Sequence, residues 1–345
     1  LSLTDLVADL GGNTLRGSLR AALNGVPQIT ANLSTDTLDL AGATSGGSGS
    51  GGASAVQGWP TTRIDASGLA AFNGEIALAA EAVRLGSVNF GRTRAVLRND
   101  RSRMVFALDE VAAYGGTLRG QFVMNNRSGL SVGGDLTGRG IGLEGLLTDL
   151  AGITRLTGAA DASVEFLGVG ASVDAIMRSL RGSGRIATGS GTIRGFDLDR
   201  LMRSGQGAGG TTVFDSLTGS FVMQDGVLSN EDLLMTLPNY EARGAGRVDL
   251  GGQTLNYLFT PKALRGNEGR GIAIPVRVRG PWAAPQIVPD LEAVVDLNFS
   301  AEKERLQDKA SDEIGDRLGV QRQEGQSLED AIEKKLEDEL GDRLR

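Results

Sequence analysis

Alternation of apolar and polar side chains at every second residue is the feature that most constrains how this chain folds. In RMVFAL, Phe106 and Leu108 lie on one side of the segment, and in TLRGQFVM, Phe122 and Met124 do the same while Arg119 lies opposite. Successive side chains of a β-strand point to opposite faces, so this pattern predicts half-buried strands. Turn residues such as Gly, Asp and Asn separate the alternating segments, which is typical of an antiparallel meander and not of βαβ units.

Glycine is unusually frequent, with 52 residues among 345, while aromatic residues make up only 4% of the chain. Such a composition predicts many turns and a thin core. About sixteen candidate strands at ~4.8 Å spacing would form a sheet on the order of 75 Å long. Too few helices are expected to cover its apolar face, so the sheet either closes on itself or curls into a trough.

The residue types that the chain lacks exclude several kinds of chemistry. It contains no cysteine and no histidine, so it has neither a Cys or His nucleophile–base pair nor a Cys/His zinc site. The net charge is −7, and no clustered basic stripe indicates a nucleic-acid-binding surface. We expect no enzyme activity, no catalytic residue, no cofactor, no metal and no nucleic-acid partner.

Changes in composition divide the chain into four regions. Residues 1–40 hold a helix and the first strands, residues 41–55 form a Gly/Ser/Ala loop, residues 56–299 form the β region, and residues 300–345 form a charged tail. The loop lacks the Lys and Ser/Thr of a phosphate-binding P-loop, so we interpret it as a flexible spacer. The tail carries leucine and isoleucine at mostly four-residue spacing among mixed charges, which predicts two amphipathic helices.

Three shorter segments are predicted to be helical from apolar residues that recur at helical spacing. They are residues 1–10, which end at a glycine pair, residues 143–151 and residues 173–180. The apolar faces of the last two are expected to pack on the sheet, and a surface that caps a groove or touches a membrane is the alternative.

Two other patterns match functional motifs in composition but not in context. Gly140, Gly142 and Gly145 spell GxGxxG ahead of a helical segment, as in dinucleotide-binding folds. A glycine-broken alternating strand precedes them in place of a buried parallel strand, so we reject nucleotide binding. Asp197 and Asp199 lie in FDLDRL without other convergent polar groups, so a helix-start or turn role is favoured over acid–base or cation chemistry.

Three glycine-based segments carry a resemblance to a known family. GSGTIRGFDLDRL, FDSLTGSFVMQDGV and GAGRVDLGGQTLNY follow one another along the chain, and a YGG turn stands at residues 114–116. These segments resemble the C-terminal region of the AsmA family, inner-membrane-anchored envelope proteins of Gram-negative bacteria. Similar signals cover roughly residues 30–290.

The resemblance implies a fold and a function. Members of the family look like bridge-like lipid transfer proteins, in which a bent, taco-like sheet holds acyl chains and leaves polar head groups in water. The implied fold is mainly β: an elongated, curved antiparallel sheet that forms a groove, with a few short amphipathic helices and a C-terminal helical tail. The implied function is binding or conducting phospholipid between the inner and outer membranes, in support of outer-membrane biogenesis.

The resemblance also implies a location and partners. We expect a periplasmic protein, anchored in the inner membrane through an N-terminal segment upstream of Leu1, which also makes the membrane contact. The expected ligand is phospholipid or another acyl lipid, and the helical tail is the candidate binding surface for an envelope protein. A non-enzymatic scaffold for outer-membrane proteins, whose groove is filled by its own side chains, remains the alternative.

Period-two alternation indicates which residues would line the groove, because each set lies on one side of its strand. The predicted lipid-groove residues are Phe106, Leu108, Phe122, Met124, Phe221, Met223, Val248, Leu255, Tyr257, Phe259, Ile274, Val276 and Val278. Arg119 and Arg277 are predicted to face outward. A continuous apolar stripe that remains accessible would separate the lipid-binding hypothesis from the scaffold.

Overall fold

The computed structural model describes residues 1–40, 58–204, 207–264 and 275–290. The chain divides into two compact units, and the first spans Leu1–Gly271 and Pro275–Pro289. The helices and strands described all belong to this first unit. The predicted Gly/Ser loop, the groove residue Ile274 and the charged helical tail lie outside the described residues.

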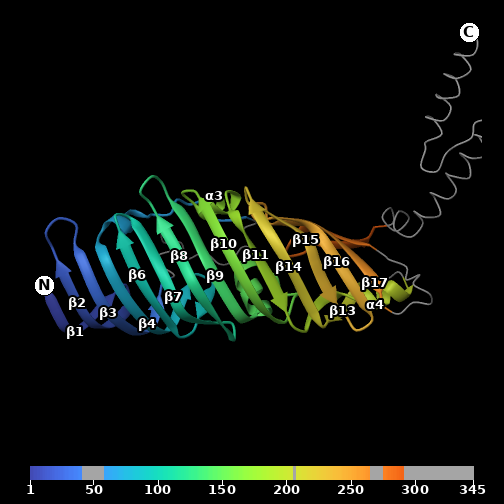
Figure 1. Ribbon diagram of the computed structural model, residues 1–345, viewed down its shortest axis with the longest axis horizontal. Helices are drawn as coiled ribbons and strands as arrows, with labels where there is room; N and C mark the ends of the chain where they lie inside the picture. The colour runs from blue at the N-terminus through green and yellow to red at the C-terminus, as the bar shows by residue number, and fades with distance from the viewer. Residues whose placement is uncertain (41–57, 205–206, 265–274, 291–345) are drawn as a thin grey trace, which may run out of the picture. The chain divides into compact units, whose positions relative to one another are not determined.

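Most of the described residues form one curved, unclosed sheet of 17 strands, which Figure 1 shows side by side. The strands of this sheet are β1 (Ser2–Leu10), β2 (Asn13–Ala22), β3 (Gln28–Asp39), β4 (Asn73–Leu85), β5 (Val88–Phe90), β6 (Thr93–Asp100), β7 (Arg103–Ala113), β8 (Gly116–Asn125), β9 (Ser131–Gly142), β10 (Ala159–Val169), β11 (Arg181–Thr188), β14 (Ser216–Gln224), β15 (Val227–Thr236), β16 (Tyr240–Asp249), β17 (Thr254–Ala263), β18 (Val276–Pro281) and β19 (Gln286–Pro289). Neighbours in the sheet follow chain order, except that β5 pairs with the end of β4 and β4 also pairs with β6. The mainly β fold with a curved sheet is therefore confirmed.

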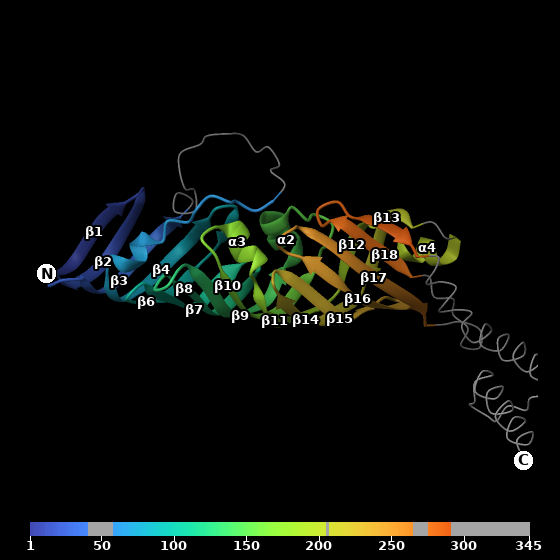
Figure 2. The ribbon, with the colours of Figure 1, turned by 90° about the horizontal axis from the view of Figure 1, so that it is seen from above.

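One strand pair departs from the predicted antiparallel arrangement. Strands β3 and β4 run parallel, from the pair Gln28 and Asn73 to the pair Asp39 and Arg84, while the other neighbours are antiparallel. Parallel strands cannot be joined by a hairpin, because the chain must return to the end where the first strand began. Residues 58–72, the described part of this connection, run along the strand ends before entering β4 (Figures 1 and 2).

The predicted helix at residues 1–10 is wrong, because this segment is strand β1. Gly11 and Gly12 adopt positive φ angles of 59° and 82° and turn the chain into β2, with which β1 pairs. A helix of ten residues is marginal on its own. Pairing with β2 satisfies the backbone of β1 on one side, so the tertiary pairing overrides the helical spacing of the apolar residues.

Short helices and a small second sheet lie at the strand ends. They are the 3₁₀ helix η1 (Ser67–Ala70), the helices α2 (Leu143–Ala151), α3 (Val173–Arg178) and α4 (Leu198–Ser204), and the strand pair β12 (Gly191–Phe196) and β13 (Ala208–Phe214). Figure 2 shows α2, α3 and the β12–β13 pair on the same side of the curved sheet. The helices predicted at residues 143–151 and 173–180 are confirmed, although the second ends at Arg178.

Asp197 has the predicted helix-start role. Its Oδ1 accepts a hydrogen bond of 2.9 Å from the backbone N–H of Arg200, in the first turn of α4. Asp199 lies inside the helix, where it forms an ion pair of 2.9 Å with Arg203 and accepts a hydrogen bond from the Tyr240 hydroxyl. The two carboxylates therefore tie α4 to its own first turn and to β16.

Candidate functional site

Cross-strand pairing arranges apolar residues in continuous rows across the sheet. Residues directly opposite each other on paired strands point to the same face. One row passes from Leu97 through Phe106, Phe122 and Gly134 to Phe166, across strands β6 to β10. The pairings of the remaining strands extend this face toward β1 on one side and β19 on the other.

Every described residue of the predicted groove lies on this one face. A Cβ atom on Gly168 would lie 2.8 Å from Cγ2 of Ile176, so helix α3 packs against this face. It is therefore the concave face, which Figure 2 shows covered by short elements. The residues are Phe106, Leu108, Phe122, Met124, Phe221, Met223, Val248, Leu255, Tyr257, Phe259, Val276 and Val278. Arg119 and Arg277 lie on the convex face as expected, and lipid contact of the set stays a prediction.

The two faces differ in charge. Away from the strand ends, the concave rows of the described strands contain no Asp, Glu, Lys or Arg. Charged side chains gather on the convex face, where Arg98 and Glu75 form an ion pair of 2.8 Å and Arg16 and Asp36 one of 3.4 Å. Such exposed pairs contribute at most about 1 kcal/mol each, so their main effect is to keep this face in water.

Aromatic rings on the concave face lie over glycines of neighbouring strands. Phe122 stands between Phe106 and Phe166, with ring centroids 6.0 and 6.3 Å away. A Cβ atom on Gly134 would lie 3.0 Å from the ring of Phe166, and one on Gly184 only 2.4 Å from the ring of Phe221. The glycines therefore leave room for rings to lie flat on the sheet, which gives the high glycine content of the chain a role beyond turns.

Burial differs between the ends and the middle of the strands. At the ends, short elements pack on the concave face and bury Leu69 to 7% exposure, Ile176 to 8%, and Leu201 and Phe214 to 0%. Large apolar side chains in the middle of the strands on the same face remain partly exposed and form what we call the apolar lane. The lane consists of Leu19, Leu33, Leu78, Leu97, Phe106, Phe122, Phe166, Phe221, Tyr257 and Val278.

A segment that sequence reasoning missed borders the lane. Residues 58–72, which we call the strap, follow the strand ends that include the turns at 101–102 and 126–130, which we call the first rim. The Trp59 indole N–H donates to the Leu250 carbonyl at 2.6 Å, and the Trp59 and Trp282 rings meet edge to face at 6.0 Å. The apolar residues of the strap recur without a regular period, so alternation could not identify it.

Backbone and side-chain hydrogen bonds hold the strap along its length. Asp174 N–H donates to the Pro60 carbonyl at 3.0 Å, and Ile64 N–H donates to the Ala171 carbonyl at 2.8 Å. Buried Asn99 donates from Nδ2 to the carbonyls of Leu69 and Phe72 at 2.8 and 2.7 Å. The strap is therefore fixed to the turn between β16 and β17, to α3 and the residues before it, and to β6, and it forms a wall at the first rim.

A polar cluster interrupts the apolar surface near β15 and β17. The Tyr257 hydroxyl donates to Oδ1 of Asn230, whose Nδ2 donates to the Ser220 carbonyl at 2.5 Å and to Asp232 at 2.7 Å. Burial, and then the Asp232 charge, raise the pKa of Tyr257 well above its ordinary value, so the phenol is neutral. Because Tyr257 and Asn230 bond to each other beside an irregular register of β15, we assign the cluster to fixing the sheet.

The other motifs carry no chemistry in the structure. Gly140 and Gly142 end β9, which pairs antiparallel with β8 and β10, so GxGxxG does not follow a parallel strand. In the part of the chain that the structure describes, no group of three or more acidic side chains converges to hold a metal ion. No helix in that part has the length and apolarity needed to span a bilayer.

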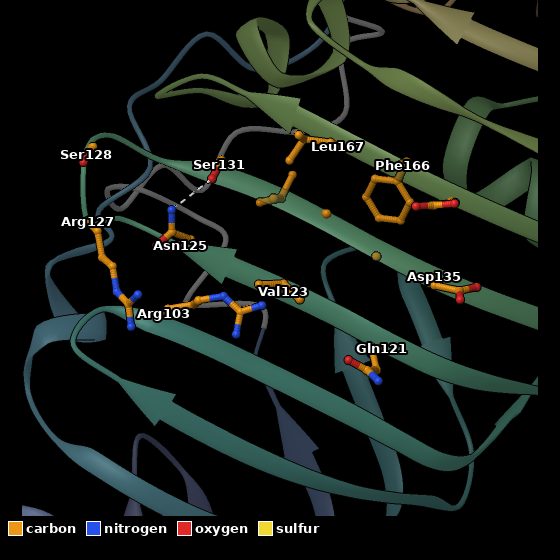
Figure 3. Close-up of a pocket in the computed structure, with 14 residues that line it drawn as sticks. Arg103, Gln121, Val123, Asn125, Arg127, Ser128, Ser131, Asp135, Phe166 and Leu167 are labelled. Atoms are coloured by element: carbon orange, nitrogen blue, oxygen red, sulfur yellow. Dashed lines mark hydrogen bonds between the residues drawn. The ribbon is translucent and has the colours of Figure 1, made fainter.

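A hollow lined mainly by polar residues lies on the convex face. It encloses about 730 Å³ above β7 to β10, where Gly133 leaves a gap between side chains. Figure 3 shows Arg103 and Arg127 at one end of this hollow, with Gln121 and Asp135 at the other. This surface is polar, whereas the lane is apolar. It was not predicted from the sequence, because its residues are the polar ones that alternate with the apolar residues of each strand.

Comparison with known proteins gives one match. The model of the AsmA family matches residues 48–233, which is more than half of the chain and includes β4 to β14. No curated protein and no solved structure matches the chain.

Proposed function

Because the chain belongs to the AsmA family, we propose that its apolar lane binds the acyl chains of phospholipids and conducts them between the inner and outer membranes. Family membership supports an envelope-associated protein. The proposed role is not enzymatic, and it includes support of outer-membrane biogenesis. In this proposal the protein lies in the periplasm, and a segment outside residues 1–345 makes its contact with the inner membrane.

The observation that carries the proposal is the partial exposure of an uncharged lane that runs from β2 to β18 and is interrupted by the Asn230 cluster at β15. In an ordinary packed core, rings such as Phe106, Phe122 and Phe166 would be fully buried. Here they remain partly exposed, although short elements bury the same face at the strand ends. Each large side chain that stays in contact with water forgoes about 1.5–3 kcal/mol of burial, and an acyl chain on the lane would recover part of this free energy.

The scaffold alternative requires the protein to fill its own groove. Phe214 and Leu201 do fill the concave side at the strand ends opposite the first rim, where both are 0% exposed. The same elements leave Tyr257 and Val278 partly exposed in the middle of their strands. Self-filling is thus confined to the ends of the strands, and this favours a lipid-binding lane over a filled scaffold.

The first test places a charge on either face of one strand. Leu97 lies in the lane, and its neighbour Val96 points to the convex face, opposite Ala77 and Ala107. The protein and the variants Leu97→Glu and Val96→Glu would be purified, and the extracted lipids measured by mass spectrometry. We expect the protein and Val96→Glu to carry phospholipid and Leu97→Glu to lose most of it, because a carboxylate in an acyl-chain site is costly.

Matched melting temperatures of the two variants would show that the loss is not due to unfolding. Equal lipid content in both variants, or no phospholipid in the unmodified protein, would contradict lipid binding by the lane.

A second test separates conduction from binding. A binding protein needs only one segment of the lane, whereas a conduit needs all of it. Phe221 lies on β14, between the lane segments of β10 and β17. We expect Phe221→Glu to retain lipid on the lane segments to either side while slowing phospholipid transfer between donor and acceptor vesicles at least about tenfold, since a charge in the path of the acyl chains is costly. Unchanged transfer would limit the function to binding.

A further inference from the structure

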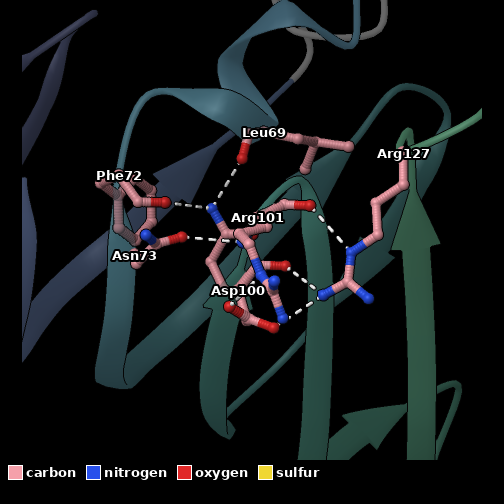
Figure 4. Close-up of polar contacts among 7 residues, drawn as sticks. Leu69, Phe72, Asn73, Asp100, Arg101 and Arg127 are labelled. Carbon is pink, nitrogen blue, oxygen red and sulfur yellow. Dashed lines mark hydrogen bonds and ion pairs between the residues drawn. The ribbon is translucent and has the colours of Figure 1, made fainter. Parts of the chain in front are cut away.

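A basic hollow lies on the first rim, beside the end of the strap. It encloses about 500 Å³ and is lined by Arg101, Ser102 and Arg127, with Asn73 and Ala70 beside them. Ala70 belongs to η1, and Arg101 and Ser102 form the turn between β6 and β7. Figure 4 shows Arg101 and Arg127 pointing toward each other below η1. Hydrogen-bond donors therefore surround this hollow from three separate segments.

The Arg127 guanidinium is fixed in place. Its Nε donates to the Arg101 carbonyl at 2.9 Å, and its Nη2 donates at 2.7 Å both to the carbonyl and to the carboxylate of Asp100. Its second terminal nitrogen, Nη1, makes no hydrogen bond within the described residues. A guanidinium held in this way loses little side-chain entropy when it binds an anion, and its planar donors fit phosphate oxygens.

The charge of this part of the rim is positive. Arg101, Arg103 and Arg127 lie on adjacent turns, and Asp100 is the acidic residue among them. Hydrogen bonding to Arg101 lowers the pKa of Asp100, so the carboxylate is charged and offsets one of the three arginines. Arg103 forms no ion pair within the part of the chain that the structure describes. The cluster therefore has an excess of about two positive charges available to an anion.

The hollow opens beside the concave face. Leu69, the neighbour of Ala70 in η1, is 7% exposed and is held by Asn99, which lies on the concave row next to Met104. An anionic group in the hollow would thus sit at the first rim, and Leu97 of the lane lies two residues from Asn99 along β6. This is the arrangement that an amphiphile needs, with its charged end at the edge and its apolar end on the lane.

From this placement we propose that the rim hollow binds the phosphate group of a phospholipid whose acyl chains lie on the apolar lane. The proposal rests on the proposed function, because it assigns the headgroup end of the same ligand. Arg101 and Arg127 bind the phosphate oxygens, Arg103 adds attraction, and the Asn73 amide and Ser102 hydroxyl supply further donors. Free phosphate shares this chemistry, so the test must distinguish the two sources.

The test compares three probes by isothermal titration calorimetry. They are dihexanoyl phosphatidic acid below its micellar concentration, dihexanoylglycerol, which lacks the phosphate, and inorganic phosphate. The test variant is Arg101→Gln with Arg103→Gln, and the matched control is Arg119→Gln, an exposed convex-face arginine on β8. We expect the double variant to weaken phosphatidic acid binding at least about tenfold, and more at low salt, because it removes one guanidinium that lines the hollow and a second positive charge beside it.

The other probes and the control variant show whether a loss of binding is specific to the phosphate group and to the rim hollow. Dihexanoylglycerol should bind the protein and the double variant equally, and Arg119→Gln should stay within about twofold of the protein for both lipids. Equal weakening by Arg119→Gln, unchanged binding by the double variant, or inorganic phosphate that binds as tightly as phosphatidic acid would each overturn the rim site. Failure of both lipids to bind the unmodified protein would instead defeat the proposed function itself.

Discussion

The middle and the ends of the strands show how one face of a sheet can serve two purposes. At the ends, Phe214 and Leu201 are 0% exposed, and short elements close the concave face as a conventional core. In the middle, Phe106 and Phe122 face the same side but stay partly exposed. The short elements at the strand ends, which we call the caps, therefore complete a buried core, while the middle of the same face is left partly exposed.

The same comparison explains why the sheet does not need to close into a barrel. The caps and the strap cover the strand ends, where apolar residues of the concave face would otherwise be exposed to water. Among the described strands, β1 and β19 do not pair with each other, so this sheet is not closed. An open sheet with closed rims leaves a lane that runs across the strands, which is the direction a lipid conduit requires.

The largest expected effect on stability comes from emptying a capped strand end. Phe214→Ala should lower the free energy of unfolding by about 3–5 kcal/mol, because the ring is fully buried and leaves a cavity. Urea denaturation followed by circular dichroism would measure it. Phe166→Ala in the lane is the matched control, and it should cost clearly less. Equal losses at the two sites would remove the distinction between caps and lane.

A smaller effect is expected where a glycine lies under an aromatic ring. A Cβ atom on Gly184 would lie 2.4 Å from the Phe221 ring and 2.5 Å from the Ser163 carbonyl oxygen. We expect Gly184→Ala to destabilise the protein by about 1–3 kcal/mol, since ring and backbone must both shift. Thermal unfolding followed by circular dichroism would measure the loss. Gly189→Ala is the control, because a Cβ atom at Gly189 would meet no atom within 4 Å. Equal melting temperatures of the two variants would show that the absence of a side chain at Gly184 is not needed for packing of the Phe221 ring.

The smallest effect concerns alkaline pH at the turn between β7 and β8. Burial, and then a hydrogen bond of 2.8 Å to Asp149, raise the pKa of Tyr114 to about 12. The unfolded phenol has a pKa of about 10, so the neutral ring stabilises the fold fully below pH 10 and progressively less as pH rises toward 12.

The melting temperature should therefore fall more steeply between pH 10 and 12 in the unmodified protein than in Tyr114→Phe. The variant keeps the ring and removes the ionisable group, so it isolates the titration from packing. Parallel pH profiles of the two proteins would contradict the assigned pKa.

Alternation identified the concave face because its signal repeats in every strand. Phe106, Phe122 and Phe221 were assigned to one side from their own segments, and the strand pairings place them on one face. The helix predicted at residues 1–10 failed, because its four apolar residues fit only the helical period. In β1 a register shift after Leu3 breaks the alternation and Val7 stays 68% exposed, so pairing with β2 selects the strand against the local pattern. Short helices with apolar faces, such as α2, were predicted well because their periodicity is local.

What the sequence could not give is the relation between distant segments. The strap contacts Leu250 and Gln253, almost two hundred residues away along the chain, through Trp59 and Gly58. The parallel pairing of β3 and β4 follows from this return path and leaves no local pattern. The rim hollow likewise joins residues of η1 and two separate turns, so neither composition nor spacing could indicate it.

The central claim is that acyl chains lie on the concave lane, and site-specific photo-crosslinking tests it most directly. A diazirine amino acid would be placed in turn at Phe122 and Tyr257 on the lane and at Arg119 and Arg277 on the convex face. The account predicts phospholipid adducts from both lane positions and none above background from the convex positions. Equal labelling of the two faces, or no labelling at either, would contradict it.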